Sequence, residues 1–123
     1  MSNSPLVSVI MNCHNSSKFL KHAIQSVYDQ TYKNWEIIFW DNKSDDTSKE
    51  IALSFDNKLK YFYSSDFTTL GEARKNATTK ANGKYLAFLD CDDYWHPSKL
   101  EKQIQIFENK ERNIGIVYGR TEY

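Results

Sequence analysis

The sequence feature that most constrains the fold is the stretch YLAFLDCDDYW, from Tyr85 to Trp95. It begins as an apolar run that is short enough for one strand, and it ends in three carboxylates within four residues. An apolar run with glycine before it and proline after it is typical of a buried, central parallel strand. Ligands bind at the carboxyl ends of the strands in open α/β sheets. The acids that mark this candidate binding edge are Asp90, Asp92 and Asp93.

The close spacing of these acids indicates a bound cation. Carboxylates this near to one another repel, and a divalent ion relieves the repulsion. Carboxylate oxygens are preferred ligands of hard ions such as Mg²⁺ and Mn²⁺. The alternative is a polar turn before the helix expected after Pro97, because clustered Asp is also common in loops. The spacing by itself leaves both interpretations open.

Apolar runs and helical segments alternate along the whole chain. This alternation predicts right-handed βαβ units in an α/β fold, a mostly parallel, doubly wound sheet with helices on both faces. The expected strands cover residues 6–11, 35–40, 59–63, 85–89 and 114–118. The expected helices begin at Ser16 or Ser17, Asp46, Gly71 and Pro97 and end near residues 30, 55, 81 and 109.

Three of the expected helices carry more specific predictions. The first has an apolar face formed by Phe19, Leu20, Ala23, Ile24, Val27 and Tyr28. The third ends at Asn82-Gly83, where Gly83 is free to adopt the left-handed conformation that closes many helices. The fourth is expected to turn Leu100, Ile104 and Phe107 inward.

The composition excludes several classes of protein. The 123 residues amount to about one domain. Lys and Arg together number 16, as do Asp and Glu, so no basic stripe is available for nucleic acid or an anionic membrane. No apolar stretch approaches the roughly 20 residues of a membrane helix, and no signal peptide precedes the first strand. Two cysteines make no disulfide framework, so the expected compartment is the cytoplasm, including its inner membrane face.

Polar residues follow three of the expected strands and share one edge of the sheet. His14 and Asn15 follow the first strand and Asp41 the second, so they can converge with the acid cluster on one crevice. The sequence contains neither a Gly-x-x-x-x-Gly-Lys loop nor a Gly-x-Gly-x-x-Gly fingerprint. A bound diphosphate would therefore need a cation and a basic side chain. Arg74 is the candidate for the latter, and a solvated helix residue is the alternative.

Four segments together resemble family 2 glycosyltransferases. They are residues 7–15, 41–47, 71–74 and 83–93, in the order that the family has. The resemblance covers nearly the whole chain and implies the GT-A fold. It also implies a nucleotide-diphosphate sugar as donor, with a UDP-sugar expected, and a divalent cation, Mn²⁺ or Mg²⁺, as cofactor. The implied reaction is transfer with inversion to a hydroxyl of a carbohydrate or lipid-linked acceptor.

The resemblance implies roles for individual residues. Asp41 is expected to accept a hydrogen bond from the base, Asp90 to lie near the ribose, and Asp92 to bind the metal that bridges the diphosphate. Ser44 and Asp46 match positions that shape a turn and cap a helix. The expected nucleotide-binding set is completed by Cys13, Asn15 and Arg74.

The sequence departs from the family pattern at three positions. Asn12 stands where the family has Pro, His14 where it has Tyr, and Lys75 where it has Asn. A different loop after the first strand can change which base is accepted, and His14 is read as a polar wall residue. Cys13 and Cys91 follow neighbouring strands of the family's sheet, so they are expected to lie near each other as small packing thiols.

The length of the chain bears on what it can do alone. The family's catalytic base, which deprotonates the acceptor hydroxyl, belongs to a segment after the fifth strand. The chain ends at Tyr123, so we assign no catalytic residue and expect residues 1–123 to be a donor-binding part without the acceptor half. We also expect self-association through the face left open, with Trp95 and Tyr118 exposed.

The rival hypothesis is a non-catalytic nucleotide-binding, metal-binding or signalling domain of the same doubly wound type. A phospho-receiver domain has an acid pair directly after its first strand and a phospho-accepting Asp after its third. Here those positions hold Asn12-Cys13-His14 and Ser64-Ser65, with Asp66 close by. This difference favours the glycosyltransferase.

Overall fold

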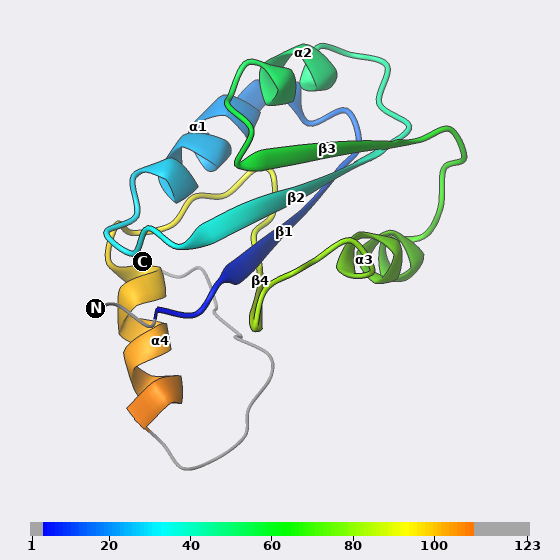
Figure 1. Ribbon diagram of the computed structural model, residues 1–123. Coiled ribbons are helices and arrows are strands. Elements are labelled where there is room, and N and C mark those ends of the chain that lie inside the picture. The colour runs from blue at the N-terminus through cyan, green and yellow to red at the C-terminus, as the bar shows by residue number, and fades with distance from the viewer. Residues whose placement is uncertain (1–3, 110–123) are drawn as a thin grey trace.

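The computed structural model describes residues 4–109, in which strands and helices alternate. Four strands form one sheet in the order β3-β2-β1-β4, and every neighbouring pair is parallel (Figure 1). The strands are β1 Val7–Cys13, β2 Trp35–Asn42, β3 Leu59–Ser64 and β4 Tyr85–Phe88. The helices are α1 Ser17–Tyr28, α2 Ser48–Leu53, α3 Leu70–Thr78 and α4 Lys99–Asn109. The expected strand at 114–118 lies outside the described residues.

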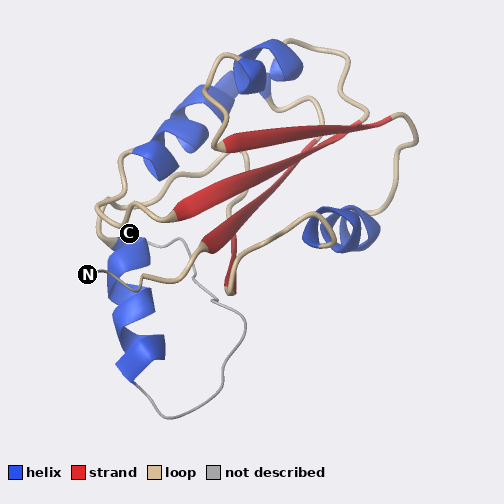
Figure 2. Ribbon diagram, viewed as in Figure 1, coloured by secondary structure: helices blue, strands red, loops and turns tan. Residues whose placement is uncertain are grey.

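Helices cover both faces of the sheet, as Figure 2 shows. Met11 of β1 belongs to the larger buried cluster, with Leu20 of α1 and Leu100 of α4. Ile10, its neighbour in the strand, belongs to a second cluster with Ala77 of α3. Successive side chains of a strand point to opposite faces, so a strand that is apolar at both positions is buried on both sides. The doubly wound fold is therefore confirmed.

β4 lies beside β1. Within residues 4–109 it pairs with β1 alone, and its place as a central strand stays a prediction because the expected strand at 114–118 lies outside the described residues. It also ends at Phe88, and the last backbone hydrogen bond to β1 runs from Leu89 N to Ile10 O at 3.1 Å. The residues that follow leave the sheet and form the loop that carries the acids.

The first helix follows its predicted pattern except at its two ends. Leu20 and Ile24 are fully buried, but Phe19 is 52% exposed, so its assignment to the core is wrong. The helix ends at Tyr28 rather than Gln30. Gln30 is buried beyond the helix, where its Oε1 accepts from Leu100 N at 3.0 Å and its amide donates to His96 O at 2.7 Å. Its side chain thus holds the start of α4, which begins at Lys99.

One carboxylate serves the starts of two helices. Neither Ser16 nor Ser17 caps α1 with its side chain, contrary to prediction. Asp46 accepts instead from Ser17 N at 3.2 Å and from Ser48 N, in the first turn of α2, at 2.9 Å. Burial raises the pKa of Asp46, but the hydrogen bonds from Ser48 and Ser17 outweigh it and lower the pKa to about 2. Asp46 was expected to cap the second helix, and it also accepts a hydrogen bond at the start of α1.

Gly83 has a different role from the predicted one. Its backbone is not left-handed, and α3 has already ended at Thr78. A Cβ atom at Gly83 would lie 2.7 Å from both the N and the Oγ of Ser8 and 2.8 Å from the Leu6 carbonyl oxygen. Glycine is needed because the chain passes directly over the start of β1.

Candidate functional site

A cleft of about 480 Å³ lies where β1 ends, α1 begins and the loop after β4 passes. Its position at the carboxyl ends of parallel strands is the one expected for a ligand site. It brings together residues from the first and fourth strand ends, as predicted, although Asp41 is not among them. The lining residues are Asn12, Asn15, Ser16, Lys18, Phe19, Asp90, Cys91 and Asp92.

The two acids of the cleft point outward from an alternating segment. Leu89 and Cys91 are buried, whereas Asp90 and Asp92 are exposed. The turn is closed by Asp93 N, which donates to Asp90 O at 3.1 Å. Both cleft carboxylates are therefore open to solvent and to a ligand.

The number of acids in the cleft decides what kind of divalent-cation site they can form. Among residues 4–109, no three or more His, Cys, Asp or Glu side chains gather closely enough to hold a metal ion. Mg²⁺ and similar ions are commonly held by one or two carboxylates together with substrate phosphates rather than by an all-protein cage. Asp90 and Asp92 share one cleft and fit that second arrangement.

Arg74 reaches the edge of the site from α3. Its Nη2 lies 3.9 Å from Asp90 Oδ1, and its guanidinium lies 5.4 Å from the centre of the Phe88 ring. The Arg74 side chain is 46% exposed and that of Asp90 70% exposed, so the pair contributes little to stability. The guanidinium remains available to an anionic ligand beside the acids.

Asp41 is fully buried at the end of β2. Its Oδ2 accepts from the Tyr61 hydroxyl at 2.5 Å, and its Oδ1 accepts from Ser44 N at 2.9 Å. Burial, followed by the hydrogen bond and charge of Asp41, raises the pKa of Tyr61. Ser44 Oγ in turn accepts from Asn15 N at 2.8 Å. Asp41 is therefore joined to the cleft through the turn that contains Ser44.

The loop after β1 is held in a fixed shape. Asn15 has a left-handed backbone with φ of 49°, and its Oδ1 accepts from Asp45 N at 2.8 Å. His14 Nδ1 lies 2.7 Å from Asn42 O, to which it donates, and its ring packs edge-on against Phe67. His14 is exposed but does not line the cleft, so its place in the wall of the site stays a prediction.

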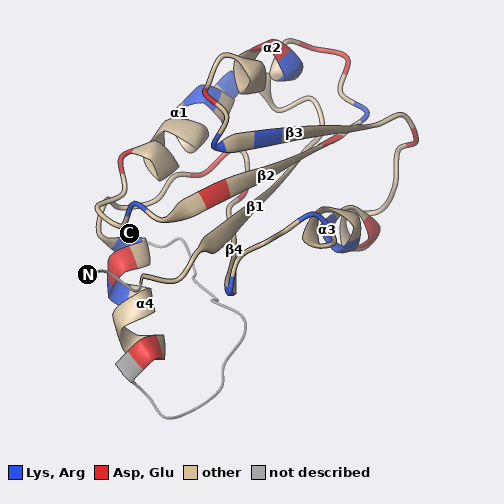
Figure 3. Cartoon of the chain, in the orientation of Figure 1, with Lys and Arg blue, Asp and Glu red and all other residues tan. Residues whose placement is uncertain are grey.

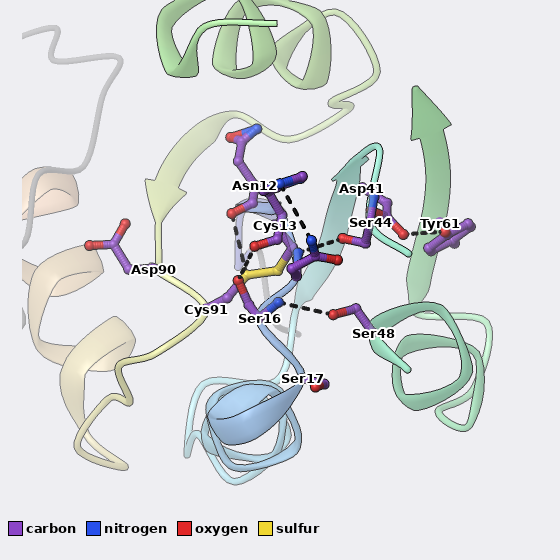
Figure 4. The surroundings of a disulfide bond; sticks show 12 residues. Asn12, Cys13, Ser16, Ser17, Asp41, Ser44, Ser48, Tyr61, Asp90 and Cys91 are labelled. Carbon is purple, nitrogen blue, oxygen red and sulfur yellow. Dashed lines mark hydrogen bonds between the residues drawn. A yellow bond between two sulfur atoms is a disulfide. The ribbon is translucent and has the colours of Figure 1, made fainter. Parts of the chain in front are cut away.

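The two cysteines form a disulfide, which corrects the prediction of two packing thiols (Figure 4). They are neighbours, as expected, because Cys13 ends β1 and Cys91 lies between the two cleft acids. Their Cα atoms are 6.0 Å apart, within the usual range for a disulfide. Both cysteines are buried, and of the pair only Cys91 is among the residues that line the cleft.

Comparison with known proteins now identifies the family. A family model described as glycosyl transferase family 2 matches residues 8–122. The chain belongs to this family. A glycosyltransferase of Rickettsia typhi is 38% identical over 115 residues, which are 94% of this chain and 36% of the relative. The Escherichia coli glucosyltransferase WfgD, named for UDP-Glc and α-D-GlcNAc-diphosphoundecaprenol, is 37% identical over 118 residues, covering 95% and 46%.

Solved structures agree with the fold. TarS of S. aureus, solved with UDP-GlcNAc, matches with a TM-score of 0.79 and 26% identity, over 83% of this chain and 31% of that one. The mannosyltransferase PcManGT of Pyrobaculum calidifontis, solved with GDP-Man and Mn²⁺, has a TM-score of 0.80. It is 18% identical over 88% of this chain and 34% of that one, so it supports the fold alone. The chain thus spans less than half the length of each of these curated relatives.

In this family 2 chain, the cleft includes residues that the sequence reasoning missed. Lys18 and Phe19 line it from the first turn of α1. The helical pattern had assigned Phe19 to the core, but a helix that starts at the ligand edge of a sheet must border the site with its first turn. Asn12 also lines the cleft, and its buried Nδ2 has no hydrogen-bond partner among the described residues.

Three expectations about the surface have different outcomes. Trp95 is only 2% exposed, so its predicted exposure is wrong, and Tyr118 lies outside the described residues. Acidic and basic residues are spread over the described chain (Figure 3), in keeping with the zero net charge. No helix within residues 4–109 has the length and apolar character needed to cross a bilayer.

Proposed function

We propose that this chain is the donor-binding part of a glycosyltransferase that moves a sugar from a UDP-sugar to an acceptor hydroxyl. The observation that carries the proposal is the single cleft in which Asn15, Asp90 and Asp92 meet, at the ligand edge of a family 2 sheet. Two relatives support uracil as the base. TarS is solved with UDP-GlcNAc, and WfgD is named for UDP-Glc.

The nucleoside would lie between the β1 loop and Asp41. Each carboxylate oxygen offers two lone pairs, so Asp41 can accept a base N–H while it keeps its hydrogen bonds from Tyr61 and Ser44. Because Asp41 is fully buried, the residues that cover it would have to move aside for the base to reach it. Asn15 belongs to the loop that would wall the nucleoside, Cys13 ends the strand that leads into this loop, and Asp90 would accept from a ribose hydroxyl.

The diphosphate would lie beside the acids and between two basic side chains. Arg74 reaches the cleft edge from α3, and Lys18 lines it from α1. Both can pair with phosphate oxygens. Asp92, with Asp90 near it, would hold the Mn²⁺ or Mg²⁺, which when bound would stabilise the charge that develops on the leaving diphosphate.

The acceptor side of the reaction is proposed from the family alone. An acceptor oxygen that replaces the diphosphate from the opposite face inverts the anomeric carbon. We assign the catalytic base, and most of the acceptor contacts, to sequence outside these 123 residues. The acceptor is a carbohydrate or a lipid-linked sugar, used in polysaccharide synthesis at the cytoplasmic side of the membrane.

The test is metal-dependent nucleotide binding in two matched variants. Asp92→Asn removes a charge that lines the cleft, whereas Asp93→Asn removes one from the next residue, which does not line it. We expect Asp92→Asn to abolish Mn²⁺-dependent binding of UDP in a calorimetric titration and Asp93→Asn to leave it nearly unchanged. Equal affinity in both variants, at the wild-type value, would refute the role of Asp92.

A further inference from the structure

We propose that Cys13 and Cys91 form a reversible disulfide that sets the affinity of the donor site. In the oxidised protein the two cleft acids are held for a nucleotide and its cation, and in the reduced protein they are not. The inference rests on the proposed function, because it concerns the same cleft.

The disulfide lies where the sheet no longer holds the acid loop. The last backbone hydrogen bond between this loop and β1 is made by Leu89. Two residues later Cys91 stands between the cleft acids, and its sulfur is bonded to Cys13. Cys13 itself is fixed, since it ends β1 and is paired in register with Asp41 of β2. The bond therefore ties the acid loop to a rigid part of the sheet.

The reduced protein has a much weaker tie at the same place. Cys91 Sγ lies 3.4 Å from the carbonyl oxygen of Asn12, to which a free thiol can donate its proton. A thiol is a weak donor, so the acid loop would gain freedom on reduction. Binding a ligand would then require that freedom to be lost again.

The cleft is also the route by which the disulfide can be made or broken. Both cysteines are buried, Cys13 at 2% and Cys91 at 4% exposed, but of the two only Cys91 lines the cleft. A small disulfide or thiol must therefore enter the donor cleft and react first at Cys91. A bound nucleotide would block that route and slow the exchange in both directions.

A glutathione couple supplies the chemistry in two exchange steps. The Cys91 sulfur attacks oxidised glutathione, forms a mixed disulfide and releases one glutathione thiolate. The Cys13 sulfur then attacks the Cys91 sulfur, forms the protein disulfide and releases the second thiolate. The two cysteine protons pass to the two glutathione thiolates, so two cysteines are oxidised while one glutathione disulfide becomes two thiols.

The expected size of the coupling follows from the loop. Ordering the backbone of one residue costs about as much free energy as a tenfold change in a binding constant. We therefore expect the oxidised chain to bind UDP with Mn²⁺ about tenfold more tightly than the reduced chain. Linkage is reciprocal, so saturating UDP must make the disulfide about tenfold harder to reduce, a shift of about 30 mV for two electrons.

The experiment compares the two redox forms of the same chain. The chain is equilibrated in glutathione buffers of graded ratio, with and without saturating UDP and Mn²⁺. The thiols are counted by alkylation and mass spectrometry, and UDP binding is titrated in fully oxidised and fully reduced protein. A variant with both Cys13→Ala and Cys91→Ala controls for effects of glutathione itself. Whatever its UDP affinity is, that affinity should not change with the glutathione ratio.

The outcomes separate this inference from the proposed function. Free thiols that persist in oxidised glutathione would overturn the disulfide, and equal UDP affinity in both redox forms would overturn the coupling. Absence of UDP binding in either form would overturn the coupling together with the proposed function. The melting temperature then still reports the disulfide by itself, because a bridge across 78 residues should raise it by at least about 10 °C.

Discussion

Removal of the Asp46 carboxylate should destabilise the chain by an amount that disappears in acid. Asp46 accepts from Ser17 N and Ser48 N, one at the start of each of two helices, so a single side chain fixes α1 and α2 relative to each other. Both helix starts favour a negative charge. Asp46→Ala would leave both backbone N–H groups without their partner.

The magnitude follows from the pKa of this carboxyl. It falls from 3.8 to about 2 on folding, which corresponds to at most about 2.5 kcal/mol. Asp46 is only half-buried, so solvent screening reduces the expected value to about 1–2 kcal/mol. Because the folded pKa is the lower one, this contribution is complete above pH 3.8 and is lost as the pH falls toward 2.

The assay is urea unfolding followed by circular dichroism at pH 7 and at several values below pH 4. Asp46→Ala should cost about 1–2 kcal/mol at pH 7, and the gap to wild type should narrow as the pH falls. Asp45→Asn is the matched control, because exposed Asp45 makes its hydrogen bond through its backbone. A gap that stays constant down to pH 2 would show that the charge of Asp46 is not what stabilises the two helices.

Three further substitutions test separate parts of the structure. Gly83→Ala should cost about 3 kcal/mol in urea unfolding, since its Cβ would meet the backbone of β1, and a loss below about 1 kcal/mol would contradict that packing. Gln30→Ala should cost about 2–3 kcal/mol, because Leu100 N loses its buried acceptor, and a neutral result would refute this role. Asp41→Ala should weaken UDP binding about tenfold or more but keep the need for metal. Tyr61→Phe, which removes only the hydroxyl contact of Asp41, is the control, and an unchanged preference for UDP over GDP in Asp41→Ala would refute the base contact.

The fold was predictable because its signals are local. The apolar runs of β1 to β4 are short and separated by helical periodicity, and that alternation permits few architectures. The predictions that were wrong concern residues whose place is determined by contacts with residues distant in the sequence. Phe19 has the spacing of a core residue, but it borders the cleft because α1 begins there. Gly83 is needed for its contact with β1, which lies 75 residues away in sequence and which no local pattern encodes.

The position of the candidate site could be predicted from the sequence, but the contacts of its buried residues could not. The meeting of Asn15 with the acids follows from parallel strands, whose carboxyl ends share one edge. The burial of Asp41 and its bonds to Tyr61 and Ser44 depend on how β3 pairs with β2 and how the turn folds. The disulfide was missed because the expected compartment was the cytoplasm, where cysteines are ordinarily free thiols.

The measurement that tests the central claim most directly is a calorimetric titration of this chain with UDP. It is made with Mn²⁺ and with a chelator, and GDP serves as the control nucleotide. The account predicts binding of UDP that requires Mn²⁺ and is tighter than that of GDP. Binding of neither nucleotide, or UDP binding that the chelator leaves unchanged, would contradict the proposal that Asp90 and Asp92 form a metal-dependent donor site.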